Sequence, residues 1–192
     1  TGIVSAIRTA AVVVAVGAVE RVLPRPGTEL PGVTTAGGMQ VMLKETGRAP
    51  RGRILIAGNG PLTIALAAQL ADRGNPPLAV LEAATPLLRP TAAPALFRHP
   101  RLLIEAAGYL RAMKAKGVAW RQGAALTAIE RRGSELVAAT VDRDGAKASL
   151  IVDHVALHDG IRPNCFGLPG MGEAADRMPV VVHAGDCREA LG

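Results

Sequence analysis

Two glycines and one carboxylate have the spacing of a nucleotide-binding site. An apolar run leads into Gly58-Asn59-Gly60, and a second apolar run ends at Glu82, which stands 24 positions after Gly58. Gly58 permits a tight turn, and Gly60 lets backbone amides approach a pyrophosphate at the positive end of a helix. Glu82 is placed to accept hydrogen bonds from the ribose of an adenosine. The pattern indicates a βαβ unit that binds a dinucleotide.

The segments around these residues must supply a strand, a helix and a second strand. The apolar runs at 54–57 and 78–81 are the expected strands, and 62–71 is the expected helix. Pro61 and Leu62 lie at the start of this helix and belong with the glycine turn to the expected cofactor-binding residues.

The glycine fingerprint departs from its usual form at the third position, where Thr63 stands. A strand–helix turn that binds nothing therefore stays open as the alternative. Arg89 follows the second strand, where the ribose 2′-phosphate of NADP could sit, but Glu82 would repel that phosphate. The residues favour NAD or another adenine nucleotide, such as ATP, over NADP.

Composition argues against a nucleic-acid partner. The formal net charge is +6, yet the basic residues are scattered and only Arg131-Arg132 are adjacent. Aromatic residues make up 2% of the chain, which leaves few platforms for stacking bases. A solvated surface and anionic ligands account for the charge.

The cysteines and histidines suggest neither a catalytic residue nor a metal site. Cys165 and Cys187 lie 22 positions apart without a CxxC pair, which excludes a thioredoxin-type redox centre and a cysteine-rich zinc site. A structural disulfide stays open, although two isolated thiols in a reducing cytoplasm are favoured. His154 and His158 are expected on one side of a strand, and neither these two nor His99 and His183 have convergent partners.

The longest apolar run, residues 10–19, is about half the length of a membrane-spanning helix. Its alternating valines predict a buried strand at 11–16. It also lacks the cleavage region of a signal peptide. We therefore expect a soluble cytoplasmic protein without a membrane span.

The remaining pattern predicts an α/β fold with a Rossmann-like βαβαβ unit followed by a three-stranded antiparallel meander. A proline- and glycine-rich stretch at 24–32 is expected to be a connection between domains. The other expected elements are helices at 35–44 and 100–116, strands at 118–120 and 180–183, and meander runs at 126–130, 135–141 and 149–157.

Three landmarks occur in a familiar order: Val14-Ala15-Val16-Gly17, then the Gly58–Leu62 turn, then Ala184-Gly185-Asp186. Because its landmarks occur in this order, the chain resembles the flavoproteins with two dinucleotide-binding domains, which form the pyridine nucleotide-disulfide oxidoreductase superfamily. The stretch ending at Gly17 is similar to that family's "ATGA" strand, with Val16 in place of threonine.

The resemblance implies an NAD-type domain inserted into an FAD-binding domain. It implies that Gly17, Gly185 and Asp186 belong to the FAD site, with Asp186 near the ribityl and pyrophosphate groups. The expected domains are an FAD-domain strand and crossover at 1–48, the NAD(P)-type domain at 49–160, and a return segment of the FAD domain at 161–192.

Within the superfamily, the residues Gly-Asn-Gly-Pro-Leu are similar to the larger subunits of opine oxidases, hydroxyproline or proline dehydrogenases and hydrogen cyanide synthases. This implies a nucleotide-binding oxidoreductase subunit that works with a second subunit. The family's opening GxGxxG unit has no counterpart before residue 1, so we expect an incomplete FAD domain and no activity of this chain alone. The alternative is a non-catalytic nucleotide-binding or scaffold subunit.

Overall fold

The computed structural model describes residues 5–85, 100–168 and 180–190. Its contacts divide the chain into a larger unit, Val22–Gly160, and a smaller unit formed by Thr1–Arg21 with Ile161–Gly192. The larger unit includes the strand at 33–35, which lies in the segment expected to belong to the FAD domain (1–48), because this strand pairs within the central sheet. The division into domains at residues 48 and 160 stays a prediction.

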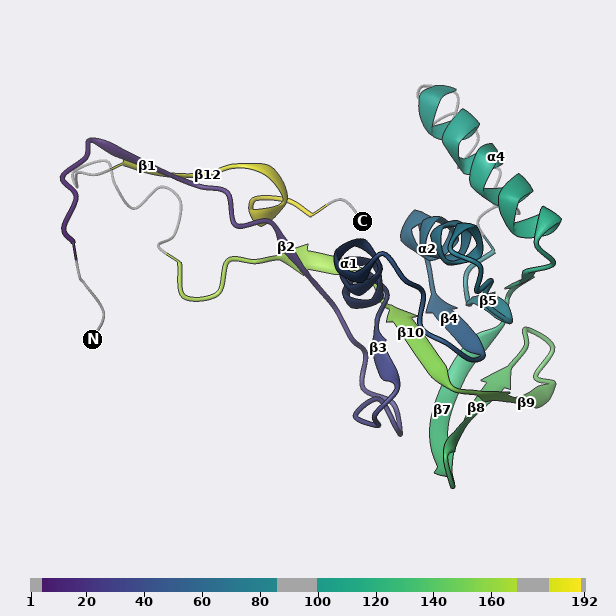
Figure 1. Cartoon of the computed structure of the whole chain (residues 1–192). Coiled ribbons are helices and arrows are strands. Elements are labelled where there is room, and N and C mark those ends of the chain that lie inside the picture. Colours follow the sequence, from purple (N-terminus) through teal and green to yellow (C-terminus); the bar gives the residue numbers. More distant parts are fainter. Residues whose placement is uncertain (1–4, 86–99, 169–179, 191–192) are drawn as a thin grey trace. The chain divides into compact units, whose positions relative to one another are not determined.

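The centre of the larger unit is a five-stranded parallel sheet, seen in Figure 1. Its middle strand is the first strand of the expected βαβ unit. In spatial order the strands are β3 (Val33–Thr35), β10 (His154–His158), β4 (Ile54–Gly58), β5 (Ala79–Glu82) and β6 (Ala119–Gln122). The expected third parallel strand is therefore confirmed.

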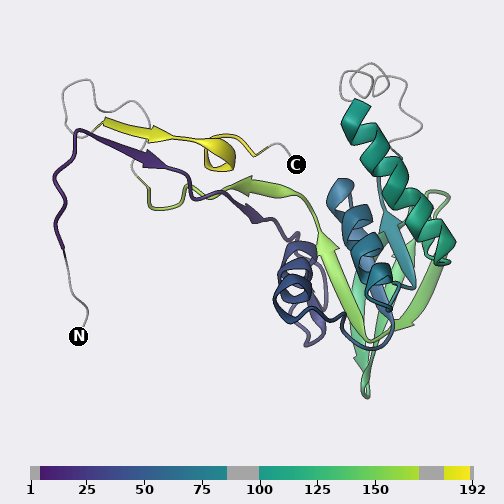
Figure 2. The same ribbon diagram turned by 45° about the horizontal axis from the view of Figure 1, so that its top comes forward.

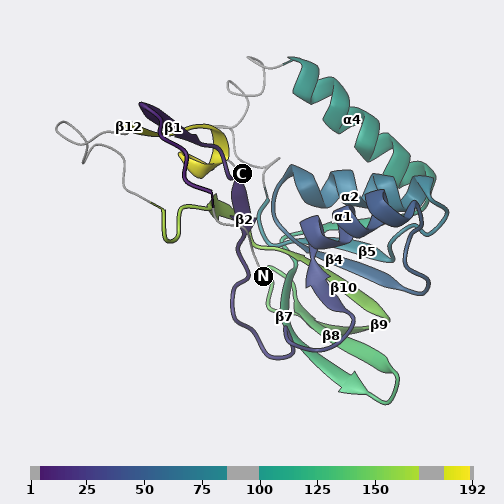
Figure 3. The same ribbon diagram turned by 60° about the vertical axis from the view of Figure 1, so that its left-hand side comes forward.

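Helices cover one face of this sheet and an antiparallel meander covers the other (Figure 3). The antiparallel meander confirms the expected three-stranded unit. The helices are α1 (Ala36–Thr46), α2 (Pro61–Asp72) and α4 (Pro100–Ala115), and the meander strands are β7 (Ala125–Arg132), β8 (Glu135–Val141) and β9 (Lys147–Val152).

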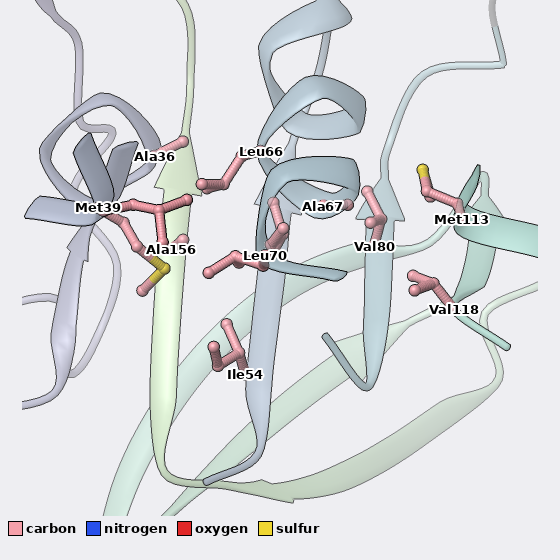
Figure 4. Close-up of a cluster of buried hydrophobic side chains, with 12 residues drawn as sticks. Ala36, Met39, Ile54, Leu66, Ala67, Leu70, Val80, Met113, Val118 and Ala156 are labelled. Carbon is pink, nitrogen blue, oxygen red and sulfur yellow. The ribbon is translucent and has the colours of Figure 1, made fainter. Parts of the chain in front are cut away.

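Strand β4 is apolar throughout because both of its faces are buried. Ile54 and Ile56 pack with the helices, as Figure 4 shows for Ile54 beside Leu70. Leu55 and Ala57 point the other way and pack with the meander. Successive side chains of a strand alternate between faces, so one four-residue run supplies two cores.

The expected meander run 149–157 is corrected by the structure. Strand β9 ends at Val152, and the chain then enters the central sheet as β10, which pairs in parallel with β3 and β4. Asp153 makes the change of layer, because its N–H donates to Arg53 O at 2.8 Å and its carboxylate accepts from Arg53 N at 2.6 Å.

The smaller unit contains two pairs of strands. β1 (Ala11–Val14) pairs in parallel with β12 (Val180–His183), as Figure 2 shows, and β2 (Ala18–Glu20) pairs antiparallel with β11 (Ile161–Pro163). A single 3₁₀ turn, η3 (Gly185–Cys187), follows β12.

The expected burial of the strand at 11–16 is wrong. The strand forms at Ala11–Val14, but Val12 and Val13 are 38% and 68% exposed. Among the described residues this strand pairs only with β12. In the described part of the chain, no helix is long and apolar enough to cross a membrane.

The glycine- and proline-rich stretch before β3 packs on the meander through Gly27. Pro26 O accepts a hydrogen bond from Ile129 N at 2.9 Å. Gly27 has a φ of +85°, and a Cβ built there would lie 1.9 Å from Ile129 O. Only glycine allows this backbone contact.

We expect Gly27→Ala to destabilise the protein by about 1–3 kcal/mol, because it forces both a positive φ and a backbone clash. Gly133→Ala is the matched control, since Gly133 also has a positive φ (+61°) but no atom within 4 Å of its Cβ position. Urea unfolding followed by circular dichroism measures both. Equal losses in the two variants would contradict the proposed contact.

An exposed ion-pair network joins Arg53, directly before β4, to Asp153, where the chain passes from β9 to β10. The Arg53 guanidinium donates to Asp153 at 3.0 Å and to Glu135 at 2.7 Å. The pKa of Asp153 is lowered from 3.8 to about 2, mainly by the hydrogen bond from the Arg53 side chain and next by that from the Arg53 N–H. Arg53 thus holds the carboxylate in its charged form.

Because the folded-state pKa of Asp153 is the lower one, this carboxylate stabilises the fold above pH 3.8, and the contribution is lost as the pH falls from 3.8 to about 2. An NMR titration of the Asp153 carboxyl group should find the low midpoint. Arg53→Gln should raise that midpoint, whereas Glu135→Gln should leave it low. A wild-type midpoint near 3.8 would refute the assignment.

Candidate functional site

The glycine turn lies at the carboxyl edge of the central sheet, between β4 and α2. A Cβ on Gly58 would lie 2.0 Å from His158 O, so this glycine lets β4 approach the end of β10. Asn59 N donates to the same carbonyl at 3.0 Å. Gly58 therefore has a structural reason to be glycine.

Gly60 has a different reason. Its φ of +99° and ψ of 174° belong to a region that only glycine occupies readily. A Cβ built there would meet no atom within 4 Å, so the space in front of the turn is open. Among the described residues, nothing blocks a close approach to the backbone at this position.

Few backbone N–H groups of the turn remain for a ligand. Gly60 N donates to Glu82 Oε1 at 3.3 Å, and Pro61 has no N–H. Thr63 N donates to Gly60 O at 3.3 Å. Since the first N–H groups of a helix have no acceptor within it, the N–H of Leu62 is the donor of this first turn that remains for an anion.

Thr63 stands at the position of the third glycine, and its side chain is accommodated within the packed turn. It is fully buried, and its hydroxyl donates to Gly60 O at 2.8 Å. The side chain of Asn59 fixes the other side of the turn, because its Oδ1 accepts from Ala84 N at 2.8 Å. The turn is thus held in shape by its own side chains.

Glu82 ends β5 and faces the turn, as expected for the acid of this motif. The residue is only 3% exposed. One carboxylate oxygen accepts from Gly60 N, and the other accepts from Trp120 Nε1 at 3.1 Å. A buried carboxylate needs such donors, since burying an unpaired charge is costly.

Two residues of this edge were not found by sequence reasoning. Trp120 lies on β6, and Gln122 at the end of β6 is the register partner of Glu82. The buried Nε2 of Gln122 has no hydrogen-bond partner among the described residues. The sequence feature that could have indicated Trp120 is that it is the only tryptophan of the chain and stands in an expected strand.

A cleft of about 130 Å³ opens on the meander side of the same edge. Asp159 lines it and accepts from Arg25 Nη2 at 2.6 Å and from Leu23 N at 2.9 Å. The ion pair is nearly buried, with side chains 14% and 6% exposed. It anchors the stretch that enters the larger unit beside the glycine turn.

The residues expected at the FAD site lie in the smaller unit, after the ends of two neighbouring parallel strands. Val14 and His183 are register partners at the ends of β1 and β12. Gly17 and Gly185 follow them with φ of +71° and +68°, and a Cβ on either would meet nothing within 4 Å. Asp186 is exposed in η3. Two open glycine positions and a carboxylate fit the approach of a polar ligand.

The described residues contain neither a disulfide nor a cluster of metal ligands. Cys165 is exposed and Cys187 is buried, and neither forms a disulfide. The Cys187 thiol lies 2.9 Å from Val14 O as a hydrogen-bond donor. Among the described residues no group of three His, Cys, Asp or Glu could hold a metal ion. His99 and Arg89 lie outside the described residues.

The sequence matches the profile of the pyridine nucleotide-disulphide oxidoreductase family over residues 4–185. It is 51% identical over 78 residues to one of the subunits of opine oxidase from Agrobacterium tumefaciens (strain Ach5), covering 41% of this chain and 16% of that protein. It is 34% identical over 111 residues to the HcnB subunit of hydrogen cyanide synthase from Pseudomonas protegens, covering 58% and 24% of the two chains.

A solved structure shows the same fold. Thioredoxin reductase of T. acidophilum superposes with a TM-score of 0.63 at 17% identity, over 92% of this chain and 57% of that one. The aligned regions span only 16% to 34% of the curated opine oxidase subunits. With a family match over nearly its whole length, the chain belongs to the pyridine nucleotide-disulphide oxidoreductase family.

Proposed function

We propose that this chain is the nucleotide-binding part of an FAD/NAD(P)-binding oxidoreductase subunit, and that it holds an adenine nucleotide at the glycine turn. One observation carries the proposal. Glu82 accepts a hydrogen bond from Gly60 N beside an open approach to the turn, at the carboxyl edge of a parallel sheet. Ligands of open α/β sheets bind at this edge.

The ligand that fits best is NAD or another adenine nucleotide with free ribose hydroxyls, such as ATP. The N–H of Leu62 at the start of α2 would bind a phosphate oxygen, while Glu82 would accept from the ribose. A 2′-phosphate would meet the Glu82 carboxylate, so NADP should bind more weakly.

FAD is the second cofactor that the family implies. Gly17, Gly185 and Asp186 would contact it, because the two glycines leave their approach open and follow adjacent strand ends. When bound, the flavin supplies two-electron chemistry, and the protein orients it. The contribution of this chain is therefore binding and orientation.

The proposed reaction class is the dehydrogenation of an amine, opine or imino acid. The similar proteins are named as subunits of opine oxidase and hydrogen cyanide synthase, which supports the proposal that this chain works with a second subunit. We also propose that it acts in the cytoplasm.

One observation favours a second candidate, a non-catalytic scaffold subunit. Both oxygens of Glu82 already accept hydrogen bonds from protein donors, so the edge of the sheet is stable without a nucleotide. In this alternative the inserted domain serves assembly, and nucleotide binding is weak or absent.

Calorimetric titration with NAD, NADP, ATP and FAD tests the nucleotide site. Gly60→Val should abolish the heat of nucleotide binding, because the side chain would fill the approach of the pyrophosphate. Gly74→Val is the matched control, since Gly74 follows the opposite end of α2 with a φ of +83° and an equally open Cβ position. Unchanged affinity in Gly60→Val would mean that the turn is not the site.

The chain alone should neither retain stoichiometric FAD nor turn over substrate. We assign the glycine turn before α2 to the other nucleotide, and the described residues of the smaller unit contain no α-helix whose N-terminus could hold the flavin pyrophosphate. Flavin absorbance after desalting, together with assays on amines, opines and imino acids, measures this. Retained stoichiometric flavin or turnover would contradict the expectation.

A further inference from the structure

The glycine turn, Glu82 and Trp120 form a continuous hydrogen-bonded chain. Gly60 N donates to Glu82 Oε1 at 3.3 Å, and Trp120 Nε1 donates to Glu82 Oε2 at 3.1 Å. One carboxylate thereby links the nucleotide-binding turn after β4 to the last strand of the sheet, β6.

We propose that Trp120 is a positioning residue of the nucleotide site: it fixes Glu82 against the turn, and it thereby selects adenine nucleotides whose ribose 2′-hydroxyl is free. The proposal rests on the proposed function and adds the residue that sets its specificity. Trp120 acts through Glu82 and is not itself a catalytic residue.

The register of the strands supports this role. Val80 pairs with Trp120, and Glu82 pairs with Gln122, on the adjacent parallel strands β5 and β6. Residues two apart on a strand share a face, so Trp120, Glu82 and Gln122 lie on one face of the sheet. Val80 and Trp120 belong to the core under the helices, which identifies this face as the helix-covered one.

The indole is well suited to hold a carboxylate. Its ring packs against the buried core, while its single N–H can only donate. Glu82 is 3% exposed and so depends on these protein donors. With its two oxygens directed at Gly60 and Trp120, the carboxylate cannot turn away from a ligand without losing a charge-assisted hydrogen bond.

Gln122 provides an independent sign that a polar group is missing at this edge. Its buried Nε2 has no acceptor among the described residues, although buried donors in proteins are nearly always bonded. A ribose hydroxyl can donate to the Glu82 carboxylate, and Gln122, the register partner of Glu82, supplies this donor on the neighbouring strand. A phosphate at the 2′ position has no proton to donate to Glu82 when fully ionised, and it is repelled.

The first experiment observes the hydrogen bond without ligand. The protein has one tryptophan, so a ¹⁵N-labelled sample gives a single indole N–H resonance by NMR. Glu82→Gln should shift this resonance and speed its hydrogen exchange. A resonance that Glu82→Gln leaves unchanged would overturn the proposal.

The second experiment measures the specificity. Trp120→Phe keeps an aromatic ring in the core but removes the N–H donor. We expect NAD affinity, measured by calorimetry, to fall about ten-fold, as for the loss of a hydrogen bond to a charged group. NADP affinity should fall less, so the preference for NAD over NADP should shrink.

Thr140→Val is the matched control. It removes another side-chain hydrogen bond of a buried residue in the larger unit, the one from the Thr140 hydroxyl to Ala148 O at 3.3 Å, but in the meander. It should lower the midpoint of thermal unfolding and leave the NAD-to-NADP preference unchanged. A merely structural role of Trp120 would give this same result.

The outcomes separate the two proposals. If wild-type protein binds none of the nucleotides, the proposed function fails and this inference fails with it. If wild-type protein binds NAD and Trp120→Phe keeps the same NAD-to-NADP preference, the inference fails alone. A reduced preference in Trp120→Phe, with Thr140→Val like wild type, supports it.

Discussion

The burial of both faces of the central sheet is the constraint on which the larger unit depends. Strand β4 gives Ile54 and Ile56 to the helix layer and Leu55 and Ala57 to the meander layer. A polar side chain on these faces needs a partner, since burying an unpaired polar group costs about 1–3 kcal/mol. Polar groups that act on a ligand must therefore gather where the strands end.

At that edge the two glycines have different roles: Gly58 allows close backbone packing, and Gly60 leaves the approach to the turn open. Gly58 is required for the approach of β4 to His158, whereas nothing but its own φ requires glycine at Gly60. The turn keeps its shape through Asn59, Thr63 and Glu82. A site held in this way loses little conformational freedom when a ligand binds, which favours affinity.

Local patterns predicted the βαβ unit, the glycine turn and the acid, because apolar runs and glycines act over a few residues. The change of layer at Asp153 could not be read from the run 149–157, since Arg53 lies 100 positions away in the sequence. The bond between Glu82 and Trp120 depends on strand order in the same way. The exposure of Val13 was missed because an apolar strand does not reveal how many layers cover it.

The hydrogen bonds of Glu82 bear on both candidate functions. A carboxylate has about four acceptor positions on its two oxygens, and one protein donor on each leaves others open. A nucleotide would then add to the network without displacing Trp120, and the carboxylate keeps its donors when the site is empty. The same bonds that make a scaffold stable without ligand also pre-organise an acceptor for ribose. The Gln122 amide, which has no partner among the described residues, favours the nucleotide-binding candidate, since buried donors in proteins are nearly always bonded.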